Sequence, residues 1–119
     1  MLKRHRLGLD GEAIAADRLT ESGYEIIGRR FACRRGDIDL VCRQGDAIVL
    51  VEVKTRAGSA FGSGADVISD VKRRALAACA AEYRAMTGWR GPIRFLLASV
   101  RLGYGGAEAG VELLADAIC

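Results

Sequence analysis

The chain has 119 residues, half of them hydrophobic, and a single proline. This length suits one domain, spanning residues 1–119, with one core, and the composition excludes a disordered or low-complexity chain. The formal net charge is +3, and nearly all Lys and Arg residues lie before residue 95. Clustered basic residues suit phosphate binding, and they equally fit ordinary solvated surfaces.

No apolar run approaches the roughly 20 residues of a membrane helix, and the basic N-terminus has no secretory pattern after it. We therefore expect a cytoplasmic protein without a membrane partner. The four cysteines, Cys33, Cys42, Cys79 and Cys119, form no CxxC motif, and His5 is the only histidine. A structural zinc site is not expected.

The first predicted element is a helix over residues 7–22, which Gly23 is placed to end. Its apolar stripe consists of Leu9, Ala13, Ala16 and Leu19. Glu12 falls on the same stripe, where a carboxylate needs a partner or a task. The alternative is that Glu12 is a favourable charge near the helix N-terminus, and spacing alone leaves both open.

Alternating and β-branched segments predict three strands, over residues 24–31, 37–43 and 47–55. A basic loop joins the first two. A turn at Gln44-Gly45 makes the second and third an antiparallel hairpin, and a Gly- and Ser-rich loop over 57–69 follows.

The second half of the chain predicts a helix over 69–86, with Ser69 as its N-cap, and an apolar strand over 93–100. The helix stripe consists of Val71, Ala75, Cys79 and Tyr83. The final segment, 110–119, is compatible with an edge strand plus a short helical turn, which the sequence does not decide. The order α-β-β-β-α-β predicts an α/β fold, with a mixed sheet flanked by helices.

Residues 49–56, VLVEVKTR, place an acid and a base inside a segment that reads as core. Pairing around the predicted turn puts Asp39 opposite Leu50 and diagonal to Glu52. Because side chains alternate along strands, both carboxylates and the Lys54 ammonium share one face. That face carries Asp37, Asp39, Val41, Ile48, Leu50, Glu52 and Lys54, and the other carries Ile38, Leu40, Cys42, Val49, Val51 and Val53.

Carboxylates that converge on a partly covered face repel one another and lose hydration. Mg²⁺ or Mn²⁺, which prefer oxygen ligands, would relieve both costs. The Lys54 ammonium would hold a water molecule or stabilise charge on a phosphate. This inventory predicts metal-assisted phosphodiester hydrolysis. The alternative is a cross-strand salt-bridge ladder on a solvent-facing surface.

These residues resemble the YraN-type family of small bacterial proteins, which is similar to archaeal Holliday-junction resolvases of the restriction-endonuclease-like PD-(D/E)xK superfamily. The resemblance covers roughly residues 6–100. It rests on Gly11-Glu12, GDIDLV at 36–41, VEVKTR at 51–56, Val67 and Lys72.

The resemblance implies a restriction-endonuclease-like core and a site in which Asp39, Glu52 and Glu12 bind Mg²⁺ or Mn²⁺ and Lys54 is the catalytic lysine. DNA, including branched DNA, is the implied partner, and a homodimer through the 93–100 region is implied by analogy. The residues expected to bind the nucleic-acid backbone are Arg29, Arg30, Arg34, Arg35, Arg56, Lys72 and Arg73.

Three functions remain at this point. The first is a metal-dependent DNA endonuclease with structural rather than sequence selectivity, because no base-reading motif is present. The second is a non-catalytic nucleic-acid-binding or adaptor protein that retains the nuclease fold. The third is a structural α/β domain that acts through a protein partner.

Overall fold

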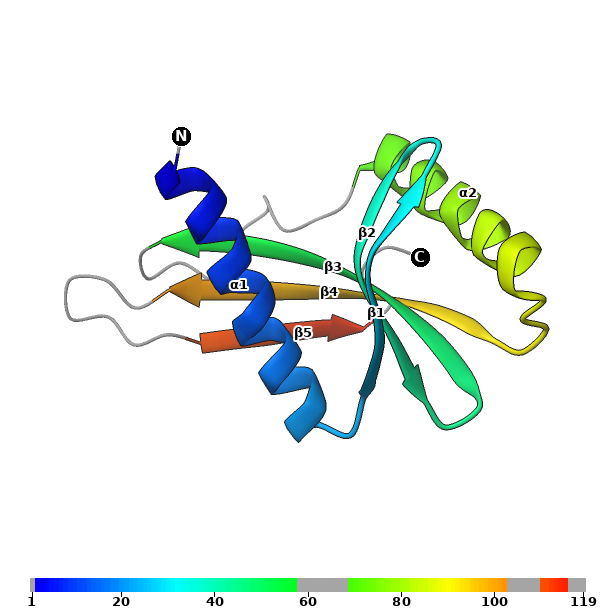
Figure 1. The fold of residues 1–119 in the computed structure, drawn as a ribbon, viewed down its shortest axis with the longest axis horizontal. Coiled ribbons are helices and arrows are strands. Elements are labelled where there is room, and N and C mark those ends of the chain that lie inside the picture. The colour runs from blue at the N-terminus through cyan, green and yellow to red at the C-terminus, as the bar shows by residue number, and fades with distance from the viewer. Residues whose placement is uncertain (1, 58–68, 103–109, 116–119) are drawn as a thin grey trace.

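The computed structural model describes residues 2–57, 69–102 and 110–115, with side chains from residue 11 onward (Figure 1). The elements are α1 Leu2–Glu21, β1 Glu25–Cys33, β2 Gly36–Gln44, β3 Ala47–Ala57, α2 Asp70–Thr87, β4 Ile93–Leu102 and β5 Gly110–Ala115. The predicted order is confirmed, and the undecided final segment contains strand β5. Outside the described residues lie nearly all of the predicted 57–69 loop, Val67, Cys119 and the side chains of His5 and Leu9.

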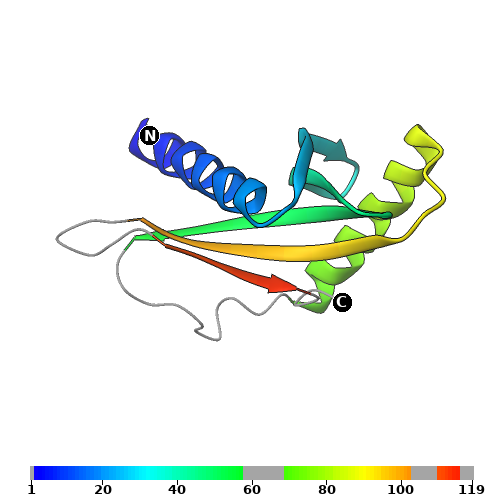
Figure 2. The ribbon, with the colours of Figure 1, turned by 90° about the horizontal axis from the view of Figure 1, so that it is seen from below.

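The five strands form one mixed sheet in the order β1-β2-β3-β4-β5. Only β3 and β4 run parallel, because α2 connects them as a crossover. α1 lies over one side of the sheet, while α2 begins on the other (Figure 2). β4 is internal, so the backbone of the 93–100 strand is already paired on both sides, and β1 and β5 are the edges. Neither described helix is long and apolar enough to cross a membrane.

The β2–β3 turn is shifted by one residue from its predicted position. Gln44 pairs with Ala47, which leaves Gly45 and Asp46 as the turn. Gly45 has φ of 61°, and the first central position of such a two-residue turn favours glycine for this reason. The β1–β2 connection is tighter than predicted, since Cys33 pairs with Gly36.

The shifted turn changes the strand partners and preserves the faces. Val41 pairs with Leu50 rather than with Ile48, a displacement of two residues, which leaves side-chain direction unchanged. Val41, Ile48 and Leu50 pack in the core beneath α2. Leu40, Cys42, Val49, Val51 and Val53 belong to the core beneath α1. Ile38 was predicted to join this second group and instead packs beneath α2.

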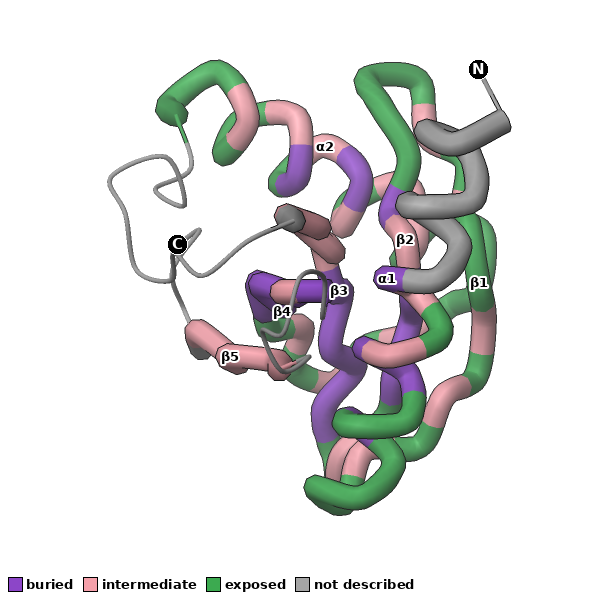
Figure 3. Tube along the Cα trace, turned by 90° about the vertical axis from the view of Figure 1, so that its left-hand side faces the viewer, coloured by how far each residue is buried: buried purple, intermediate pink, exposed green. Residues whose placement is uncertain are grey.

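Figure 3 shows the buried core running along β2, β3 and β4. Two helix positions were predicted wrongly, because Ala13 is exposed and Val71 is 77% exposed. A step of four residues advances about 400° around a helix, so the predicted α2 stripe of four-residue steps drifts off the buried face. Ala13 lies six residues before the buried Leu19, about 120° away from it around α1. α2 instead buries Leu76 and Cys79, and its cap at Ser69 is confirmed by the Oγ that accepts a hydrogen bond from Lys72 N at 3.2 Å.

Gly11 allows α1 to approach the end of β3 closely. A Cβ at this position would overlap Thr55 Oγ1 and lie 2.9 Å from both Thr55 Cβ and Cγ2. Real Cβ contacts are longer than this, so any larger residue would push α1 away from the sheet. Because Glu12 is the next residue, the glycine also fixes the height of the Glu12 carboxylate above β3.

We predict that Gly11→Ala destabilises the protein by about 1–3 kcal/mol through overpacking. A loss of stability would be informative, because replacing glycine by alanine inside a helix ordinarily stabilises the protein by roughly 1 kcal/mol. Urea unfolding of Gly11→Ala in the native and Thr55→Ala backgrounds measures the effect. The cost should shrink in the Thr55→Ala background, and a Gly11→Ala protein as stable as the native one would contradict the close approach.

Candidate functional site

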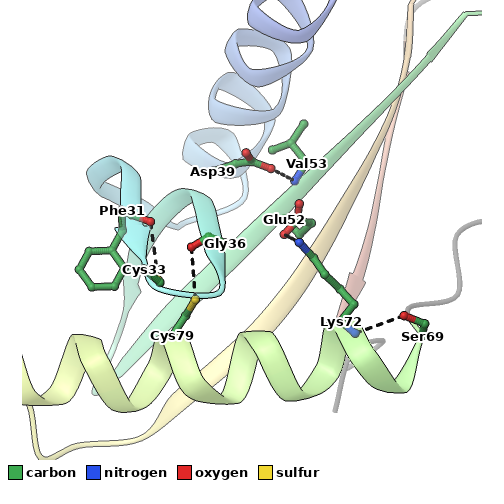
Figure 4. A network of polar contacts seen from close by, with 9 residues as sticks. All are labelled: Phe31, Cys33, Gly36, Asp39, Glu52, Val53, Ser69, Lys72 and Cys79. Carbon is green, nitrogen blue, oxygen red and sulfur yellow. Dashed lines mark hydrogen bonds and ion pairs between the residues drawn. The ribbon is translucent and has the colours of Figure 1, made fainter.

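Strand β2 separates from β3 at Asp39. The β2–β3 pairing ends at Leu40 and Val51. Beyond this point the Asp39 side chain, in place of the β2 backbone, accepts a hydrogen bond from β3. Its Oδ2 accepts a hydrogen bond from the backbone N–H of Val53 at 2.7 Å (Figure 4). The carboxylate therefore occupies the gap between the diverging strands, with one oxygen fixed by the backbone.

Glu52 lies beside Asp39, as the shifted register requires. The two carboxyl groups are close enough to share a hydrogen bond. Burial raises the pKa of Asp39, against the lowering effect of the Val53 N–H. Burial also raises the pKa of Glu52, and the Asp39 charge raises it further. Two carboxyl groups whose pKa values are raised by burial therefore lie side by side on the sheet.

Lys72 partly neutralises this pair. Its Nζ lies 3.3 Å from Glu52 Oε2, and its charge lowers the pKa of both acids. The contact is poorly directed, because the buried Oε2 has no hydrogen-bond partner of good geometry among the described residues. The capped first turn of α2 carries Lys72, so the position of this helix sets the position of the ammonium. The resemblance suggested a phosphate contact for Lys72, whereas the structure pairs it with Glu52.

Lys54 is two residues beyond Glu52 and shares its face of β3 by strand alternation. In the parallel register it lies opposite Ser99 of β4. Ser99 is fully buried, and its Oγ has no hydrogen-bond partner within the described parts of the chain. The sequence analysis did not single out this residue. The feature that could have drawn attention to it is its hydroxyl group within an apolar strand.

Glu12 approaches the pair from α1. Its side chain is 12% exposed, and its Oε2 accepts a hydrogen bond from Arg30 Nη2 at 2.8 Å. Burial raises the pKa of Glu12, Arg30 lowers it, and the charge of Asp39 raises it. Over residues 11–56, 69–102 and 110–114, however, no three His, Cys, Asp or Glu residues gather as a metal-binding group. The structure thus brings Asp39 and Glu52 together and holds Glu12 next to them through Arg30.

Arg30 adopts a backbone conformation that is unusual for its residue type. Its φ is 54°, which costs an L-residue roughly 1–2 kcal/mol. The flanking pairs of β1 with β2 place it opposite Asp39. Its charge lowers the pKa of Asp39 as well as that of Glu12. Arg30 is therefore the counter-charge of the acid group, and no local sequence pattern predicted its left-handed backbone.

The other predicted basic residues are more dispersed. Arg29 is exposed on β1, and Arg34 and Arg35 form the exposed β1–β2 turn (Figure 3). Arg73 lies 3.9 Å from Asp70 at an exposed position. Arg56 is two residues beyond Lys54 on β3.

The paired carboxylates fit a divalent cation. Mg²⁺ commonly takes one or two carboxylates together with water molecules, and Asp39 and Glu52 supply two whose charge burial disfavours. The buried Glu52 Oε2, with its poorly directed contact to Lys72, is the atom with the clearest need for another positive partner. These observations favour a cation site over a solvent-facing salt-bridge ladder.

We predict that Asp39→Asn/Glu52→Gln stabilises the protein at neutral pH. Because the folded-state pKa values are raised, stability that is present when both acids are protonated is lost as the pH rises above their ordinary values near 4. The double variant should match the native protein at acidic pH and exceed it by about 1–2 kcal/mol at pH 7.

Urea unfolding across this pH range measures the difference. The control variant Glu25→Gln/Asp46→Asn removes two exposed acids and should not show the divergence. A double variant less stable than the native protein at pH 7 would show that the acids are not electrostatically strained.

Comparison with known proteins places these residues in a bacterial family. A UPF0102 protein of Moorella thermoacetica is 39% identical over 98% of both chains. A UPF0102 protein of Rhodococcus jostii is 38% identical over 93% of this chain and 94% of its own, and one of Symbiobacterium thermophilum is 42% identical over 85% and 86%. The model of "Uncharacterised protein family UPF0102" matches residues 11–100, which include all four acid and lysine positions of the site. The chain therefore belongs to the UPF0102 family, the family that the YraN-type resemblance indicated.

Proposed function

We propose that the protein is a divalent-cation-dependent endonuclease that hydrolyses phosphodiester bonds in branched or repair-type DNA. The observation that carries this proposal is the desolvated pair of Asp39 and Glu52 carboxylates in the gap where β2 leaves β3. A purely structural role does not account for two half-buried like charges, because neutral side chains would fill the same place at lower cost. DNA as the substrate is consistent with a cytoplasmic protein.

Asp39 and Glu52 would hold Mg²⁺ or Mn²⁺, which when bound supplies Lewis acidity and lowers the pKa of water. The Val53 N–H fixes Asp39, and Lys72 restrains Glu52, so both carboxylates are oriented before any ligand arrives. Preorganisation of this kind reduces the reorganisation needed during reaction.

Lys54 shares the face of Glu52 and carries a compact charge with three donors. We assign it the role of donating hydrogen bonds to the attacking water or to a non-bridging phosphate oxygen. The Arg30 side chain is 53% exposed, so its guanidinium is able to exchange Glu12 for a substrate phosphate. Such an exchange would leave the Glu12 carboxylate available to orient water.

A second function is favoured by one specific feature, the internal neutralisation of the acids by Lys72 and Arg30. A site whose charges are already compensated fits a non-catalytic nucleic-acid-binding or adaptor protein. In that case DNA binding would weaken steeply with salt and would be indifferent to cations and to Glu52→Gln.

We predict that the native protein cleaves at least one member of a panel of labelled duplex, flap, junction and single-stranded DNA with Mn²⁺ or Mg²⁺. Glu52→Gln and Lys54→Met should each reduce the rate at least a hundredfold, the scale expected for loss of a group that acts in the transition state. Glu25→Gln, an exposed acid on β1, is the matched control. Absence of cleavage by the native protein at high concentration, or full activity of Glu52→Gln, would refute the proposed chemistry.

A further inference from the structure

The surface where β1 meets the C-terminal half of α2 contains two hollows, of about 350 and 550 Å³. Both are lined by Met86, so they adjoin at this side chain. The smaller hollow follows β1 from Ile27 to Ala32, and the larger one lies between the β1–β2 turn and α2. We call the two together the β1–α2 groove.

The floor of this groove is apolar. Ile27 is 46% exposed and Met86 is 73% exposed, and both line the smaller hollow. Ile27 stands at a register irregularity of β1 between Ile26 and Gly28, and such bulges redirect a side chain. Beneath them, Phe31 and Tyr83 form an edge-to-face pair with ring centroids 5.4 Å apart. Among the described residues, Val71 is the one other exposed large hydrophobic side chain.

The rim of the groove is basic. Arg29 and Arg30 line the smaller hollow, and Arg34 and Arg35 line the larger one. Glu82 is the acid in the larger hollow, and its Oε2 is occupied by the backbone N–H of Arg34 at 3.0 Å. An apolar floor between guanidinium groups matches a ligand that combines flat apolar rings with regularly spaced negative charges.

The groove also leads to the acid pair. Arg30 belongs to its rim and contacts Glu12, and its charge acts on Asp39. A nucleic-acid strand with a phosphate on Arg30 would therefore contact the residue that neutralises Glu12 and Asp39.

We propose that the β1–α2 groove binds an unpaired stretch of a nucleic-acid strand, with bases against Ile27 and Met86 and phosphates on the four arginines. The faces of bases in a duplex are covered by stacking, so an apolar floor gains contact area only from unpaired bases. Apolar side chains such as Met and Ile are also used to separate or cap base steps. The inference rests on the proposed function for its ligand class and narrows the substrate to DNA with an unpaired strand beside the cleavage site.

Fluorescence anisotropy in EDTA tests binding without cleavage. The probes are a blunt duplex, the same duplex with a single-stranded tail, a single strand, and that strand with abasic sites. The native protein should bind the tailed duplex and the single strand more tightly than the blunt duplex. Ile27→Thr/Met86→Gln should lose about tenfold in affinity for the tailed and single-stranded probes and should bind the blunt duplex as before.

Two controls separate the base contacts from the phosphate contacts. Val71→Gln changes the exposed α2 side chain outside the groove and should bind like the native protein. Arg34→Gln/Arg35→Gln should weaken the binding of all probes. For the single strand it should reduce the slope of log affinity against log salt by roughly 1.4, the value for two lost phosphate contacts. The abasic strand should bind the native protein as weakly as the apolar variant binds the intact strand, with no further loss when both changes are combined.

Equal binding of the native, Ile27→Thr/Met86→Gln and Val71→Gln proteins to the tailed duplex would overturn the inference. Binding of a poly-glutamate peptide as tight as that of the single strand would overturn it too, in favour of a protein partner. These outcomes do not depend on cleavage. If Ile27→Thr/Met86→Gln loses affinity for the tailed duplex while no DNA is cleaved, groove binding is supported and the nuclease proposal is refuted. If DNA is cleaved and this variant binds like the native protein, only the groove proposal is refuted.

Discussion

The hydrogen bond from the Val53 N–H to Asp39 Oδ2, 2.7 Å long, is the contact on which the candidate site depends. A backbone N–H exposed where two strands diverge needs an acceptor, and here a carboxylate supplies it. This arrangement lets β2 leave β3 without an orphaned donor, and it fixes Asp39 beside Glu52. The same feature therefore ends the β2–β3 ladder and creates the acid pair, so fold and site have one local cause.

Burial and neighbouring cations have opposite effects on the ionisation of this pair. Burial disfavours the ionised forms of Asp39 and Glu52, whereas Lys72 from α2 favours both of them and Arg30 from β1 favours that of Asp39. Arg30 has a left-handed backbone, and backbone strain of this kind tends to occur at functional positions. The elements that hold the two cations, α2 and β1, are also the walls of the β1–α2 groove. Arg30 is common to both features, since it lines the smaller hollow of the groove and its charge lowers the pKa of Asp39.

The sequence was sufficient to predict the α/β class, the element order, the closeness of Asp39 to Glu52 and the shared face of Val41, Ile48 and Leu50. That shared face was robust because the error in the turn moved the partners by two residues, which preserves side-chain parity. Val71 was misplaced because a stripe of four-residue steps drifts around a helix. The Lys72–Glu52 contact, the burial of Ser99, the redirected Ile38 and the positive φ of Arg30 were not predictable, because each depends on how separate elements pack or on where β2 leaves β3.

We propose that the paired carboxylates of Asp39 and Glu52 bind a divalent cation. Titration of Mn²⁺ into the DNA-free protein, followed by calorimetry and by the melting temperature, tests it most directly. The native protein should bind Mn²⁺ and melt at a higher temperature as the cation is added, since a ligand that binds the folded state stabilises it, and Asp39→Asn/Glu52→Gln should show neither effect. Equal Mn²⁺ binding by the native and double-variant proteins, or none by either, would contradict the account.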